Sequence, residues 1–188
     1  MNNLSEILDD SREETVQKYL EKNPSLLLAA FGNRWVVNEC IPKFKFGNEF
    51  ISDFVIVTGQ SFSYDITLIE LEPPTERIFT QNGKYAKRLN DSIGQINDWL
   101  SWINDNMDYF KQSLAKKINN YYGASQINGL HTRRLFVSSK IIIGRRSMLT
   151  DEDNKRRATI YAQTNKTLEI LPYDRLIEIE ELNNKISS

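Results

Sequence analysis

The chain has 188 residues, of which 40% are hydrophobic and 26% charged, and its formal net charge is −1. This length and balance predict one globular domain spanning residues 1–188 and exclude a disordered chain. No apolar run reaches the roughly 20 residues that span a bilayer, and the first ten residues are too acidic for a secretory signal, so we expect a cytoplasmic protein that does not bind membranes.

The chain contains one cysteine, Cys40, and one histidine, His131. These counts exclude disulfide frameworks, zinc fingers and multi-histidine metal sites. Nothing around either residue resembles the turn that presents a catalytic nucleophile, so we interpret Cys40 as a structural residue. Any chemistry is therefore expected to depend on carboxylates.

The first predicted element is a helix over residues 12–21. Ser11 and Glu14 have the spacing of a capping box at its start, and Pro24 requires that it end shortly before. Glu14 can serve as this cap or as a carboxylate that leans toward the next elements. Residues 34–46 follow as an extended segment.

Residues 51–72 predict a β-hairpin, because the apolar runs FVIV and ITLI are separated by a turn containing Gly and Ser. Glu70 and Glu72 end the second strand and share a face, because strand side chains alternate. If the turn is centred after Ser61, Asp53 lies directly opposite Glu70, with Cβ atoms about 5 Å apart.

Three carboxylates at one place destabilise a sheet and raise one another's pKa. A bound divalent cation removes this cost, since Mg²⁺ takes oxygen ligands and can orient a water for attack on a phosphodiester. The alternative is a solvated hairpin face with acids placed for solubility. Spacing alone leaves both interpretations open.

From Lys84 onward, apolar residues recur at alternating spacings of four and three, which predicts one amphipathic helix of about eight turns. This helix can pack on the sheet or form the seam of a homo-oligomer. Gln95 is the polar exception on its wide apolar face. Its side chain can bond within the core or face the carboxylates.

The remaining segments alternate between strands and helices. Residues 119–129 predict a loop, residues 134–143 a buried strand, and Thr150 with Asp153 the cap of a further helix. A strand at residues 167–171 and a helix from Tyr173 complete the chain. The order predicts an α/β fold with a mixed central sheet flanked by helices.

Asp53, the acidic pair on the next strand and a helix over the sheet resemble the PD-(D/E)xK fold of restriction-endonuclease-like enzymes. More specifically, the chain resembles the nuclease domain of Shedu-type anti-phage defence proteins. The resemblance is carried, in chain order, by Glu14-x-x-Gln17, Ser52-Asp53-Phe54, Ile69-Glu70-Leu71-Glu72-Pro73, Gln95-Ile96-x-x-Trp99, Ile143-Gly144-Arg145-Arg146 and Pro172-Tyr173-Asp174-Arg175-Leu176.

This resemblance implies cleavage or nicking of phage DNA with Mg²⁺, or Mn²⁺, held by Asp53 and Glu70. It implies a supporting role for Gln95 and a further ligand in Glu14. The family pattern has Lys where this chain has Glu72. Glu72 is then a third ligand or a general base, and Lys84 or Lys87 is a candidate to supply the missing charge.

DNA is the expected partner, and four arginines are the expected contacts to its phosphates: Arg145, Arg146, Arg156 and Arg157. A basic run can equally be a solvated face. The missing lysine also leaves a rival hypothesis, in which the chain is an inactive nuclease-fold module that binds nucleic acid or a partner protein.

Overall fold

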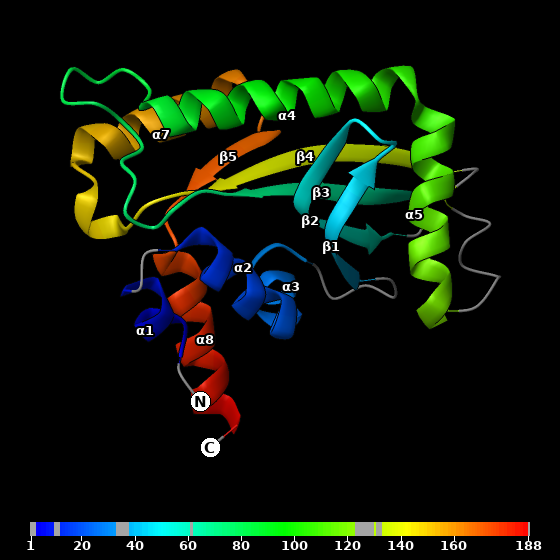
Figure 1. Ribbon diagram of the computed structural model, residues 1–188, viewed down its shortest axis with the longest axis horizontal. Coiled ribbons are helices and arrows are strands. Elements are labelled where there is room, and N and C mark those ends of the chain that lie inside the picture. Colours follow the sequence, from blue (N-terminus) through cyan, green and yellow to red (C-terminus); the bar gives the residue numbers. More distant parts are fainter. Residues whose placement is uncertain are drawn as a thin grey trace.

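A five-stranded sheet with the order β1-β2-β3-β4-β5 forms the centre of the molecule (Figure 1). The strands are β1 (Asn38–Phe46), β2 (Phe50–Gly59), β3 (Ser63–Leu71), β4 (Arg134–Ile142) and β5 (Leu168–Leu171). β1, β2 and β3 are antiparallel neighbours, whereas β4 and β5 run parallel to β3. The computed structural model describes residues 3–9, 12–32, 38–60, 62–122, 130 and 133–187. The predicted α/β fold with a mixed sheet is confirmed.

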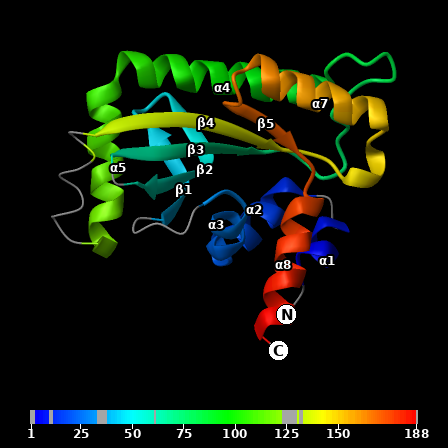
Figure 2. The ribbon, with the colours of Figure 1, turned by 180° about the vertical axis from the view of Figure 1, so that it is seen from behind.

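Helices cover both faces of this sheet (Figures 1 and 2). They are α1 (Leu4–Asp9), α2 (Glu13–Lys22), α3 (Pro24–Phe31), α4 (Lys87–Asp105), α5 (Met107–Tyr122), α7 (Asp151–Gln163) and α8 (Asp174–Ser187), with a short 3₁₀ turn at Arg146–Met148. α4, α5 and α7 pack on one face, and α1, α2, α3 and α8 pack on the other. None of the described helices is long and apolar enough to cross a membrane.

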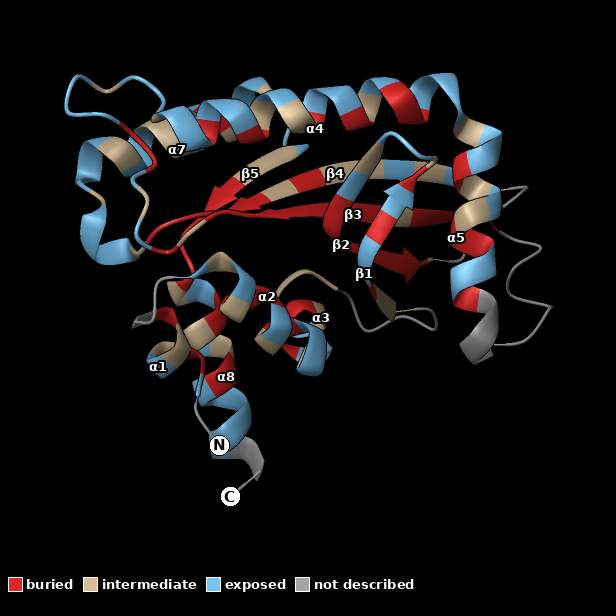
Figure 3. Ribbon diagram, viewed as in Figure 1, coloured by how far each residue is buried: buried red, intermediate tan, exposed pale blue. Residues whose placement is uncertain are grey.

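Most residues of the β2–β3 hairpin are buried (Figure 3). Their side chains enter two different apolar clusters, one on each face of the sheet. Val55 and Leu68 contribute to the cluster under α4, while Phe54 and Ile69 contribute to the cluster under α2 and α8. Burial on both sides explains why these strands read as continuous apolar runs rather than as alternating patterns.

The prediction of one long helix of eight turns is wrong, because the chain breaks at Asn106. Asn106 has φ −125° and ψ 32°, and both its backbone N–H and its side-chain Nδ2 donate to the carbonyl of Trp102. The backbone bond is the ordinary bond of an α-helix, so α4 stops because the φ and ψ of Asn106 leave the helical region, and the side-chain bond supports that end. α5 then continues in a new direction (Figure 1).

The two predicted helix caps have different outcomes. At α7 the Thr150 side chain accepts from the Asp153 backbone and the reciprocal bond is present, which confirms that capping box. At α2 the N-cap residue is Arg12, without a side-chain cap, so the capping box predicted with Glu14 is wrong. Ser11 lies outside the described residues, so the structure does not place its hydroxyl.

Several other predictions fall partly outside the described residues. His131 lies outside the described residues. Residues 34–37 of the predicted extended segment and 123–129 of the predicted loop lie outside them too. Residues 119–122 of that predicted loop belong to α5, so this part of the loop prediction is wrong.

Candidate functional site

The carboxylate cluster, defined here as Asp53, Glu70 and Glu72, lies at the end of the hairpin. β2 pairs with β3 through Phe54↔Ile69, and the same register continued by one residue places Asp53 opposite Glu70. All three residues are buried, with exposed fractions of 6 to 9% for the whole residue. The strand register predicted from the turn position is therefore found.

Asp53 is held by two donors. Its Oδ2 accepts from the backbone N–H of Leu71 at 2.7 Å, which ties the start of β2 to the end of β3. Its Oδ1 forms an ion pair with Lys43 of β1 at 2.5 Å. Lys43 was not singled out from the sequence, although its ammonium contacts this carboxylate directly.

Glu70 is the most perturbed carboxyl of the cluster. Burial is the largest cause, and the negative charges of Asp53, Glu72 and Glu13 add to it, so that the pKa of Glu70 rises from 4.5 to about 9. Lys43 opposes this rise only in part. Without a further positive charge, the side chain of Glu70 is therefore protonated at neutral pH.

Glu72 faces α4. Its Oε1 accepts from the Ser92 hydroxyl at 2.6 Å, while its Oε2 is buried without a hydrogen-bond partner and lies 3.7 Å from Nη1 of Arg88. Burial raises the pKa of Glu72, and Ser92 and Arg88 oppose that rise. The backbone carbonyl of Glu72 accepts from the hydroxyl of the fully buried Tyr173 at 2.9 Å, which fixes the chain where β3 ends.

The structure brings Glu13, rather than Glu14, toward the cluster. The Glu14 side chain is 78% exposed and forms an ion pair with Lys18, one turn further along α2. Burial raises the pKa of Glu13, and the charge of Asp53 raises it further. The expectation that Glu14 joins the carboxylates is therefore corrected to its neighbour, because the helix turns Glu14 outward.

The other sequence candidates lie on or before α4. Gln95 is half-buried and sits one helical turn after Ser92, the residue that reaches Glu72. Lys84 and Lys87 are both exposed. The cation that approaches Glu72 from this helix is instead Arg88.

The cluster presents carboxylate oxygens, the ligand type that a small divalent cation takes. Among the described residues, no three His, Cys, Asp or Glu side chains are gathered closely enough to form a ready metal cage. Mg²⁺ commonly takes only one or two carboxylates and fills its other positions with water and substrate phosphate. Asp53 and Glu70 can supply these two ligands, and the unpartnered Oε2 of Glu72 can accept from a bound water.

Arg145 and Arg146 have partners within the protein. Nε of Arg145 lies 3.3 Å from Oδ2 of Asp174, and the same Oδ2 accepts from the backbone N–H of Arg146 at 2.6 Å. The Arg146 guanidinium pairs with Glu178 and stays 55% exposed. These bonds join the turn after β4 to the start of α8.

Arg156 and Arg157 of α7 also make internal contacts. Arg156 pairs with Asp153 at 3.1 Å and lies over the ring of Phe79. Arg157 donates from Nε to the carbonyl of Ile170 at 2.8 Å, and burial lowers its pKa. The basic run therefore makes structural contacts at α7.

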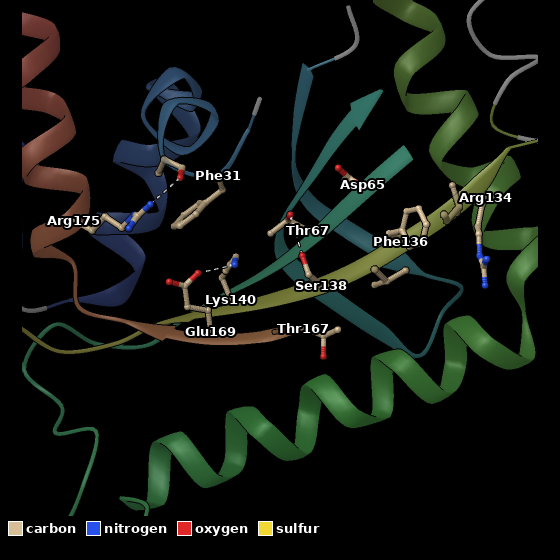
Figure 4. A pocket seen from close by; sticks show the side chains of 13 residues that line it. Phe31, Asp65, Thr67, Arg134, Phe136, Ser138, Lys140, Thr167, Glu169 and Arg175 are labelled. Atoms are coloured by element: carbon tan, nitrogen blue, oxygen red, sulfur yellow. Dashed lines mark hydrogen bonds and ion pairs between the residues drawn. The ribbon is translucent and has the colours of Figure 1, made fainter. Parts of the chain in front are cut away.

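A separate cavity of about 570 Å³ lies on the sheet face next to α3 (Figure 4). Its lining includes Thr67 and Ser138, whose hydroxyl oxygens are 3.3 Å apart, and the Lys140–Glu169 ion pair. None of the three clustered carboxylates lines it. The cavity and the carboxylates are therefore different places on the molecule.

The chain matches one known protein family across most of its length. The family described as Shedu protein SduA, C-terminal, matches residues 10–177. The match contains the whole sheet and the carboxylate cluster. No curated protein sequence matches the chain.

Proposed function

The chain belongs to the Shedu protein family, and on that premise we propose that it is a Mg²⁺-dependent DNA endonuclease acting in anti-phage defence. Family membership supports the defence role. The cleavage activity is supported by the carboxylate cluster, and above all by Glu70. Its pKa of about 9 indicates that burial and the neighbouring negative charges outweigh the positive charge of Lys43. Perturbed carboxyls of this kind gather at functional sites.

The cluster's residues have distinct proposed roles. Asp53 and Glu70 hold the metal, which supplies charge stabilisation and an activated water at the phosphodiester. Glu72, kept in place by Ser92, orients that water through its unpartnered Oε2. Glu13 and Gln95 complete the surroundings of the cluster from α2 and α4.

DNA is the proposed substrate, which makes the cytoplasm the proposed compartment. Arg146 is better placed for a phosphate contact than Arg145 or Arg156, because its side chain is more exposed than theirs. Homo-oligomerisation remains a prediction made from the apolar face of one long helix, and the apolar faces of α4 and α5 pack on the sheet.

The test is cleavage of supercoiled plasmid and linear DNA with Mg²⁺ or Mn²⁺ by the parent, Asp53→Asn and Glu70→Gln. Both variants keep side-chain shape but cannot supply the anionic oxygen that a cation binds, so both should lose cleavage while staying folded. Asp65→Asn is the matched control, because Asp65 lies on β3 like Glu70 but outside the cluster. This variant should cleave like the parent. Equal cleavage by all four proteins would refute the proposal.

A rival function is favoured by one observation. Both oxygens of Asp53 are already occupied, by Lys43 and by the Leu71 N–H, as they would be in a module that keeps the fold without the metal. Such a module retains DNA in a gel-shift assay without cutting it, and its DNA binding does not respond to Mg²⁺ or to Glu70→Gln. This outcome would replace the endonuclease with a binding module.

A further inference from the structure

Lys43 lies at an irregular position in β1. The strand pairs with β2 through Pro42↔Phe54 and Phe44↔Ser52, in one register on both sides, so that Lys43 stands opposite Asp53 between them. Lys43 has φ +45°, in the left-handed region that residues with a Cβ rarely adopt. Such outliers persist where the surrounding structure enforces them, often at functional sites.

The irregularity changes the face to which β1 directs its side chains. Ile41 and Phe44 both enter the apolar cluster under α4, although residues three apart on a regular strand point to opposite faces. The residues between them are exposed. The backbone conformation at Lys43 thereby frees its side chain from the core and directs it along the sheet edge to the carboxylates.

The Lys43 side chain joins solvent to the buried cluster. It is 52% exposed, whereas the Asp53 side chain that it contacts is 10% exposed. Arg88, the other cation near the carboxylates, lies 3.7 Å from Glu72, too far for a hydrogen bond. Among the residues that the structure describes, Lys43 is therefore the cation in direct contact with a proposed metal ligand, and its long stem allows the ammonium to move.

We propose that Lys43 supplies, from β1, the positive charge of the nuclease site that the chain lacks at Glu72. This inference rests on the proposed endonuclease function. In the protein without DNA, Lys43 neutralises Asp53. When DNA binds, the ammonium turns to a non-bridging oxygen of the scissile phosphate, and the Asp53 oxygen that it leaves becomes available to the cation.

The experiment compares Lys43→Met with Lys45→Met, which removes an exposed lysine two residues further along the same strand. Single-turnover DNA cleavage at saturating Mg²⁺ should be about a hundredfold slower or more in Lys43→Met, the usual effect of removing one charge-stabilising donor. Lys45→Met should cleave like the parent. Lys43→Arg should recover most of the lost rate, because it restores the charge.

Binding of Mn²⁺ without DNA, measured by calorimetry, separates this role from mere support of the fold. Removing a cation that competes for Asp53 should leave Mn²⁺ affinity unchanged or make it tighter. If the Met variant does not fold, Lys43→Gly replaces it, since glycine suits the left-handed backbone. The glycine variant should show the same loss of rate and the same Mn²⁺ binding.

Three results would overturn the inference: parental cleavage by Lys43→Met, equal loss in Lys43→Arg, or Mn²⁺ affinity that falls tenfold when Lys43 is removed. Parental cleavage by Lys43→Met together with inactive Glu70→Gln would reject only the role of Lys43. Parental cleavage by Glu70→Gln would reject the endonuclease itself.

Discussion

Replacing Glu70 with glutamine should stabilise the metal-free protein, and the gain should grow with pH. The folded state raises the pKa of Glu70 from 4.5 to about 9, through burial and through Asp53, Glu72 and Glu13, against the opposing charge of Lys43. Between these two values the folded chain binds a proton that the unfolded chain has released. Stability is therefore full below about pH 4.5 and falls as pH rises toward about 9.

The size of the effect follows from these values. About pH 7 lies roughly 2.5 pH units above the unfolded pKa of 4.5. At about 1.4 kcal/mol for each pH unit, this corresponds to roughly 3 to 4 kcal/mol of lost unfolding free energy. Glutamine has the shape of the protonated acid and needs no proton. Glu70→Gln should therefore be more stable than the parent by an amount approaching this figure at neutral pH, and by almost nothing near pH 4.5.

Urea denaturation in EDTA at about pH 5 and about pH 8, followed by fluorescence of the tryptophans, measures this difference. Adding Mg²⁺ should stabilise the parent, which can bind the ion, and leave Glu70→Gln unchanged. Glu181→Gln, at an exposed position of α8, is the control and should match the parent at both pH values. A Glu70→Gln protein that is no more stable than the parent at about pH 8 would refute the electrostatic reasoning.

Two further changes test the supports of the cluster, and a third tests a helix cap away from it. Ser92→Ala removes the donor to Glu72 and should lower the free energy of unfolding by about 1–3 kcal/mol in urea, whereas Ser101→Ala on the exposed side of α4 should change little. Tyr173→Phe leaves the buried carbonyl at the end of β3 without its donor, and thermal melting should show a loss of about 1–3 kcal/mol. Thr150→Ala removes the α7 cap and should cost about 1 kcal/mol, with no effect on Mn²⁺ binding.

The hairpin and its register were predictable because local signals agree there. Two apolar runs, a short turn and period-two side-chain directions together place Asp53 opposite Glu70, and the structure has that register. The Thr150 cap was predictable for the same reason, since both of its reciprocal bonds lie within four residues.

The break between α4 and α5 was not predictable from apolar spacing. The apolar period continues across Asn106, while the break lies in the non-helical backbone angles of Asn106, whose side chain donates to the Trp102 carbonyl. Periodicity reports which face is buried, and the faces of two successive helices can continue one pattern although their axes differ. The asparagine itself was the available signal, because its side chain competes with helical bonding.

The surroundings of the carboxylates depend on contacts between segments distant in sequence. Lys43 reaches Asp53 from another strand, and Ser92 reaches Glu72 across the 73–86 connection. Ser92 lies one turn before Gln95, so its position on the helix gave some indication of its role. The choice of Glu13 over Glu14 follows from where α2 begins, and the first residue of a helix is the least certain feature of a sequence-based prediction.

Anomalous diffraction from crystals soaked in Mn²⁺ tests the central claim most directly. The account predicts one strong peak between the carboxylates of Asp53 and Glu70, with the Lys43 ammonium moved away from Asp53. Density that still joins Lys43 to Asp53 at high Mn²⁺, with no peak beside Glu70, would contradict it.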